Sequence, residues 1–147
     1  GVEDYKDFER EATFKDCDGI DHCFQIGKKI HPTGICWEAI EFIEEDKVGY
    51  SFEIHQEFEE DSNGALKRLY KKIKKGLSQK HIKREVFRGH ELISFKDNLV
   101  EGRIEWDDRY ETDMPKFIID GQEYSLEEFG RMMMSCEGWN FKLEINE

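Results

Sequence analysis

The sequence of 147 residues lacks several features that mark particular protein classes. No apolar run approaches the roughly 18 residues that a membrane-spanning helix requires, and no signal peptide precedes the charged start. The chain also lacks the G-x-S-x-G, Walker, G-x-G-x-x-G and H-E-x-x-H motifs. These absences predict no membrane partner, and they exclude a catalytic centre built on any of those four motifs.

Cysteine and proline are scarce, with four and two residues respectively. The cysteines have no paired spacing and no C-x-x-C motif: Cys17, Cys23, Cys36 and Cys136. A zinc site assembled around His22 and Cys23 (with Cys17 and His31) is disfavoured, because neighbouring residues of a strand point to opposite faces. Without a secretory signal, the pattern predicts reduced thiols in a cytoplasmic protein rather than a disulfide framework.

Charged residues make up 38% of the chain and hydrophobic residues 37%, and the net charge is −12. Aromatic residues reach 13%, with eleven phenylalanines, which argues for a folded core rather than disorder. The length suits one compact acidic domain over 1–147, with possible sub-halves at 11–84 and 99–147. A start at Gly1 rather than Met predicts a fragment that lacks an upstream N-terminal segment.

Alternating apolar residues predict strands in the first third of the chain. After a polar lead-in at residues 1–10, the expected strands are two within 11–30 around an Asp18-Gly19 turn, one at 35–45 and one at 48–58. A helix follows, because five apolar residues recur at helical spacing: Leu66, Leu69, Tyr70, Ile73 and Leu77. Asp61, Ser62 or Asn63 caps its start, and Gly76 is a candidate for its end. Residues 80–98 are expected to be a loop with a possible short strand at 91–95.

The remaining third predicts strands around a second helix. The expected elements are a strand at 99–106, a hairpin at 115–125 with an Asp120-Gly121 turn, a helix opened by the capping box Ser125–Glu128 and ended by Gly138, and a last strand at 139–145. That last strand carries Trp139, Phe141, Leu143 and Ile145 on a single face. The predicted fold is α+β, with mostly antiparallel pairing and the order ββββ-α-βββ-α-β.

Residues 99–145 contain GRIEWDD and, further on, FIIDGQEYSLEEFGRMMMSCEGWNFKLEI. This stretch resembles the carboxyl-terminal signature of an uncharacterised bacterial domain family, GRIEYD…IDGKEYTWEELGRMLMTYEGWQFRLEI. The stretches FQIGKKIHPTGICWEAIEF and KKIKKGLSQKHI are similar to further parts of its pattern, so the resemblance covers about residues 12–145. It implies that relatives carry a small zinc ribbon before this domain, and it assigns no activity.

The segment 62–84 carries nine basic residues and no acidic one, whereas the rest of the chain sums to −21. The nine candidate binding residues are Lys67, Arg68, Lys71, Lys72, Lys74, Lys75, Lys80, Lys83 and Arg84. Three interpretations of this segment stay open: it binds nucleic-acid phosphates, it docks on an acidic protein surface including a second copy, or it is a solvated helix face. The solvated face is the commonest of the three, and nucleic acid is possible but not favoured.

Acidic residues gather between 101 and 113, where they are candidate ligands for a divalent metal: Glu101, Glu105, Asp107, Asp108, Glu111 and Asp113. No partnered His or Lys stands nearby in the sequence to serve as a base, which disfavours metal-assisted hydrolysis. The pattern D-x-D-G-x-D at 16–21 lacks the glutamate that a calcium loop needs at its twelfth position, so it predicts a turn.

The sequence therefore favours a noncatalytic interaction or adaptor module of a bacterial cytosolic protein, with no cofactor, no metal and no catalytic residue. Its expected partner is an unknown protein or a second copy. The alternatives are a nucleic-acid-associated domain that uses 62–84 and a metal-assisted hydrolase that uses the 101–113 cluster.

Overall fold

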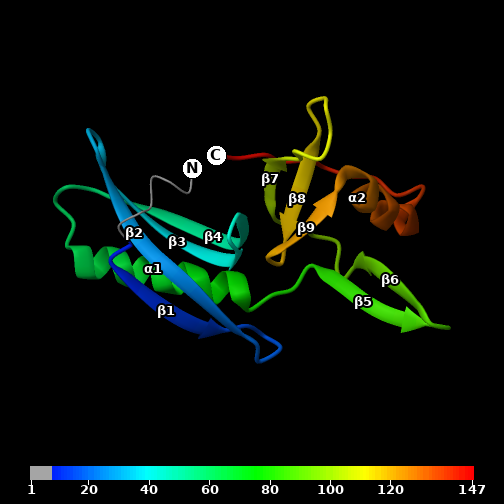
Figure 1. Ribbon diagram of the computed structural model, residues 1–147, viewed down its shortest axis with the longest axis horizontal. Helices are drawn as coiled ribbons and strands as arrows, with labels where there is room; N and C mark the ends of the chain where they lie inside the picture. The colour runs from blue at the N-terminus through cyan, green and yellow to red at the C-terminus, as the bar shows by residue number, and fades with distance from the viewer. Residues whose placement is uncertain (1–7) are drawn as a thin grey trace.

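The computed structural model describes residues 8–147 and shows two sheet-and-helix halves side by side, joined by a short linker (Figure 1). The first half contains the strands β1 (Arg10–Lys15), β2 (Asp21–His31), β3 (Gly34–Glu44) and β4 (Lys47–Gln56), followed by the helix α1 (Ser62–Leu77). The strands form one antiparallel sheet in the order β1-β2-β3-β4. Of the polar lead-in expected at residues 1–10, residues 1–7 lie outside the described part, and Arg10 already belongs to β1.

The core of the first half lies between α1 and this sheet. The predicted apolar stripe of α1 faces inward: Leu66, Leu69, Ile73 and Leu77 are buried, and Tyr70 is half-buried. They pack against the sheet residues Phe24, Ile26, Trp37 and Ala39. Asp61 caps the helix through a hydrogen bond from the Asn63 amide. Gly76 is the next-to-last residue of α1, which ends at Leu77. A Cβ atom on Gly76 would stand 2.4 Å from the Phe52 ring.

The second half contains two small antiparallel sheets and a short helix. One sheet pairs β5 (Ile82–Phe87) with β6 (His90–Phe95), and the other has the order β7-β8-β9, from β7 (Arg103–Trp106), β8 (Pro115–Ile119) and β9 (Gln122–Ser125). The helix α2 (Leu126–Met133) continues into a 3₁₀ turn at Met134–Cys136. The core of the second half is smaller than that of the first: Ile119, Tyr124 and Met132 are buried, with half-buried apolar neighbours that include Phe117 and Phe129.

The predicted turn and cap residues of the second half are confirmed at three places. Asp120 and Gly121 both have positive φ, as a two-residue hairpin turn requires. The capping box is present, because the Ser125 hydroxyl accepts from the Glu128 amide and the Glu128 carboxylate accepts from the Ser125 amide. Gly138 adopts a positive φ of 85° just after the helical segment.

The α+β class with two helices among antiparallel sheets is confirmed, while two segments differ from expectation. Residues 82–95 form a complete hairpin: β6 confirms the short strand expected at 91–95, but β5 stands where a loop was expected. Arg88-Gly89 makes the tight turn between the two strands, with positive φ at both residues. The strand expected at 139–145 was wrong: the chain there is exposed and without regular structure, because no strand in residues 8–147 pairs with it. Alternation of apolar and polar residues indicates the two faces of a strand, but it does not show that a neighbouring strand is present to pair with it.

The two halves touch through β4 and the β8–β9 turn. Arg103 donates to the Gly49 carbonyl at 3.0 Å, and a Cβ atom on Gly121 would lie 2.7 Å from the Tyr50 ring. The Asp120 carboxylate accepts hydrogen bonds from the amides of His81 and Ile82, at 2.8 and 2.9 Å. In the part of the chain described, neither helix is long and apolar enough to cross a membrane.

Candidate functional site

The basic segment 62–84 divides into two groups in the folded chain. Four lysines follow one exposed side of α1, beside its apolar stripe: Lys67, Lys71, Lys74 and Lys75. All four are exposed, and none of their ammonium groups has a hydrogen bond or ion pair with residues 8–147. They form one positive stripe, because residues spaced by three and four lie on the same helix face. This stripe is the part of the predicted basic site that is available to a partner.

The other five basic residues are bound within the chain. Their partners are Glu60 for Arg68 (2.6 Å), the Glu53 carbonyl for Lys72 (2.7 Å), Asp16 for Lys80 (3.1 Å), Glu85 for Lys83 (3.0 Å) and Glu91 for Arg84 (2.6 Å). Lys80, Lys83 and Arg84 follow the helix rather than belong to it. Charge counted along the sequence therefore overstates the positive surface of α1.

The acidic cluster at 101–113 is largely committed to local contacts. The Asp107 carboxylate is buried and accepts two hydrogen bonds from the Arg109 guanidinium, at 2.8 and 2.6 Å. These bonds hold the pKa of Asp107 at about 2. Glu105 pairs with Arg103 at 2.6 Å. Within residues 8–147, no three acids of this cluster bring ligand atoms within 4.8 Å of one another, so the geometry does not support a metal centre there.

A different trio does bring its ligand atoms together on the exposed side of the first sheet: Cys36, Glu38 and Glu53. The Cys36 thiol lies 3.8 and 3.9 Å from the two carboxylates. Burial, reinforced by both negative charges, raises its pKa to about 11. The thiol is therefore protonated at neutral pH in the metal-free chain. The trio offers three ligand atoms, fewer than the four of a closed structural metal site, and Glu53 is exposed, so we assign no metal to it.

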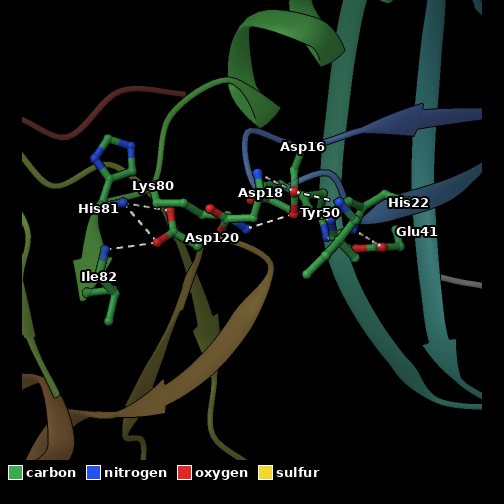
Figure 2. Close-up of polar contacts among 10 residues, drawn as sticks. Asp16, Asp18, His22, Glu41, Tyr50, Lys80, His81, Ile82 and Asp120 are labelled. Carbon is green, nitrogen blue, oxygen red and sulfur yellow. Dashed lines mark hydrogen bonds and ion pairs between the residues drawn. The ribbon is translucent and has the colours of Figure 1, made fainter. Parts of the chain in front are cut away.

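The most connected polar cluster centres on Asp16, in the loop between β1 and β2 (Figure 2). One carboxylate oxygen accepts from the amides of Asp18 and Ile20, at 2.8 and 3.0 Å. The other lies 2.8 Å from His22 Nε2 and 3.1 Å from Lys80 Nζ. The turn predicted at 16–21 is present, although its carboxylate also holds two side chains that the sequence pattern does not indicate.

These contacts fix the ionisation of the cluster. Burial alone would raise the pKa of Asp16, but the hydrogen bonds from His22, the Ile20 amide and Lys80 lower it well below its ordinary 3.8. Burial likewise acts to lower the pKa of Lys80, while the hydrogen bond to Asp16 outweighs it and raises that pKa. The pair is therefore charged at neutral pH.

His22 lies between two carboxylates, with Nε2 on Asp16 and Nδ1 2.5 Å from Glu41 Oε2. A catalytic histidine needs one ring nitrogen facing a nucleophile or substrate. Both nitrogens of His22 are occupied by carboxylates, so the ring has no position left for a general base. The cluster joins the 16–20 loop, β2, β3 and the linker, and its chemistry is structural.

A cleft of about 240 Å³ lies where the halves meet. Its polar lining includes Tyr50, His81, Arg103 and Asp120. The Tyr50 hydroxyl is buried and has no hydrogen-bond partner in the part of the chain that the structure covers. Burial raises its pKa to about 12, so it is a neutral phenol. Asp120 and Arg103 already bind backbone groups of the chain, and Glu101 is the other acidic side chain of the lining.

A run of unpartnered apolar side chains lies in the C-terminal tail, which we define as residues 139–147. Four apolar side chains alternate along it, with exposed fractions of 66, 91, 75 and 66%: Trp139, Phe141, Leu143 and Ile145. Two further apolar residues stand exposed on the edge strand β7, Ile104 at 54% and Trp106 at 66%. The alternation of apolar and polar residues predicted this apolar face from the sequence. Only the structure shows that nothing in residues 8–147 covers it.

Two family models together cover nearly the whole described chain. Residues 6–78 match a domain of unknown function (DUF7686), and residues 81–147 match a second domain of unknown function (DUF7713). The boundary falls in the linker between α1 and β5, which is also the boundary between the two cores. No curated protein and no solved structure matches the chain. The resemblance to an uncharacterised domain is thus confirmed.

Proposed function

We propose that this chain, which consists of two domains of unknown function, is a noncatalytic interaction module of the bacterial cytosol. In this proposal the tail binds a protein partner as an added strand. One observation carries it: the tail presents four apolar side chains in strict alternation, each at least 66% exposed. Four free thiols accord with the reducing compartment.

The alternation suits strand addition better than a featureless apolar contact. An added strand gains main-chain hydrogen bonds from a sheet edge, and its alternate side chains bury on one face. The intervening residues of the tail are polar: Asn140, Lys142, Glu144 and Asn146. They would stay on the polar face while the apolar row is covered. A run of exposed apolar side chains of this length marks an interaction surface in a monomeric chain.

The internal pairing of the charged groups supports a noncatalytic role. His22 is held between two carboxylates, Asp107 is bound to Arg109, and Lys80 is bound to Asp16. Each of these groups forms part of the scaffold that fixes the fold. The exposed surface, in contrast, offers apolar and basic side chains suited to recognition.

A tail variant tests the proposal. The full chain captures partners from a host extract, and each purified partner is then titrated directly against the wild type and Phe141→Asp. We expect Phe141→Asp to weaken binding by at least about thirtyfold, because a buried aromatic anchor is replaced by a charge. Val86→Asp is the matched control, since Val86 is also apolar and 77% exposed but lies on β5. Equal binding by wild type and Phe141→Asp for every partner would refute the proposal.

A second candidate function is nucleic-acid association through the lysine stripe of α1. It is favoured by four exposed lysines that have no internal partner, Lys67, Lys71, Lys74 and Lys75. Four phosphate contacts predict that log K falls with log salt at a slope of about −3.6 on duplex DNA. Reversing Lys71 and Lys75 to Glu should abolish the mobility shift at low salt. A chain that shifts neither DNA nor RNA at low salt would remove this candidate.

A further inference from the structure

We propose that the tail is received by a second copy of this chain, as an antiparallel strand on the free edge of β7. The inference rests on the proposed function and names its partner. In the register we assign, Lys142 lies opposite Glu105 and Glu144 lies opposite Arg103. Reciprocal exchange of tails between two copies gives a closed two-fold dimer.

The edge that would receive the tail is open. Within residues 8–147, β7 pairs only with β8, so its outer backbone groups are available to another strand. Ile104 and Trp106 share one face of β7 and are exposed. Ile104 is paired with Phe117, whose ring stacks on Phe129 of α2 with centroids 4.5 Å apart. A strand added at this edge would therefore extend the apolar face that α2 covers.

The sequences of the two strands select one register. The apolar residues of the tail can share a face with Ile104 and Trp106 only in every second antiparallel register, because side chains alternate. Placing Lys142 opposite Glu105 puts Glu144 opposite Arg103. Glu105 and Arg103 pair with each other at 2.6 Å within one chain, so Lys142 and Glu144 would place an opposite charge beside each member of that pair. The same register sets Leu143 opposite Ile104 and Phe141 opposite Trp106, as directly facing cross-strand pairs.

The neighbouring registers fail on charge. A shift of two residues in one direction places Lys142 opposite Arg103, and a shift in the other direction places Glu144 opposite Glu105. Like charges directly opposite each other destabilise a strand pair. A parallel arrangement with Phe141 opposite Ile104 satisfies Lys142 with Glu105 but leaves Arg103 facing Asn140. Only the assigned register pairs both charges and both apolar residues.

The path of the tail argues for a second copy. After α2 the tail runs crosswise to β7 and β8 rather than alongside them (Figure 1). It makes no strand ladder with β7 of its own chain. The tail and the edge are thus both unpaired in one chain although they complement each other. Two copies satisfy both, whereas a heterologous partner would leave the β7 edge open.

Engineered cysteines test the register and the partner together. Directly opposed residues of an antiparallel pair have Cα atoms about 4.5–5.5 Å apart, within the range of a disulfide. In a Cys17→Ser/Cys23→Ser background, which removes the two exposed native thiols, mild oxidation of Ile104→Cys/Leu143→Cys should give a covalent dimer. Mixing the single variants Ile104→Cys and Leu143→Cys should cross-link one copy to the other. Ile104→Cys with Lys142→Cys, on opposite faces in this register, should not cross-link.

Sedimentation equilibrium of the uncrosslinked chain provides the second measurement. Wild type and Val86→Asp should dimerise, and Phe141→Asp should weaken the dimer by at least about thirtyfold. A disulfide-linked monomer from the double cysteine variant would show pairing within one chain and overturn the inference. The inference would also be overturned if the wild type stays monomeric and the Ile104→Cys/Leu143→Cys variant does not cross-link. If the wild type is monomeric but Phe141→Asp still weakens its binding to a purified heterologous partner, the proposed interaction role stands and only the identification of the partner as a second copy is wrong.

Discussion

The two halves of the molecule solve the problem of covering apolar surface differently. Ten buried apolar residues form the core of the first half, between α1 and a four-stranded sheet, whereas three form that of the second. Of the eighteen large apolar side chains exposed in residues 8–147, fourteen lie in the second half. The first half thus buries much of its apolar surface in its own core, whereas the second leaves apolar surface exposed, which in our proposal a second copy covers.

The comparison is tested most strongly by one substitution placed in both halves. Leu69→Ala empties a site of zero exposure in α1, and we expect it to lower the free energy of unfolding by about 3 kcal/mol. Leu143→Ala removes the same atoms from a side chain that is 75% exposed, and should leave the stability of the monomer within about 0.5 kcal/mol. Urea denaturation of dilute protein measures both. Similar losses at the two positions would show that the tail is buried within its own chain.

The Asp16 cluster is the next largest expected effect. Asp16→Asn removes the charge that holds Lys80 and should cost about 2 kcal/mol at neutral pH. Because the folded pKa of Asp16 is lowered, its contribution is complete well above pH 3.8 and is lost as the pH falls below that value. As the pH falls below 3.8, the free energy of unfolding of Asp16→Asn should therefore decrease less steeply than that of the wild type. Parallel acid titrations followed by circular dichroism would detect this, and identical acid slopes would contradict it.

A smaller effect is expected where the halves are joined. Asp120→Asn keeps a residue that tolerates positive φ but weakens the bonds to the His81 and Ile82 amides, at a cost of about 1 kcal/mol. Hydrogen exchange should rise at those two amides while the amides of α1 stay protected. Asp97→Asn, an exposed substitution on a loop, is the control. Unchanged exchange at His81 and Ile82 would show that the contact does not hold the linker.

The smallest effect concerns Tyr50. Its buried hydroxyl has no partner in residues 8–147, so Tyr50→Phe removes an unsatisfied polar group without opening a cavity. We expect stability to stay the same or rise by about 1 kcal/mol. Thermal denaturation measures the change. A clear loss of stability would indicate that the hydroxyl is satisfied in solution, for example by a bound water in the cleft.

Local patterns predicted most of the fold and little of the polar cluster. The stripe of α1, the Asp120-Gly121 turn and the Ser125 cap were predicted because their interactions lie within a few residues. The short strand at 91–95 was predicted, but its partner β5 was missed because the turn between them uses Arg88, a rare residue for a positive φ. Asp16 meets Lys80 across 64 positions, and no local pattern carries that information. The free positive charge of the basic segment 62–84 was overestimated for the same reason, since acids outside the segment pair with four of its residues and the Glu53 carbonyl binds a fifth, Lys72.

The linker also sets how much length the chain tolerates at its junction. Lys80 and His81 are consecutive, yet the side chain of Lys80 is bound to Asp16 in the first half and the amide of His81 to Asp120 in the second. No spare residue separates the two attachments. Inserting even one residue between Lys80 and His81 would therefore break either the contact of Lys80 with Asp16 or that of His81 with Asp120.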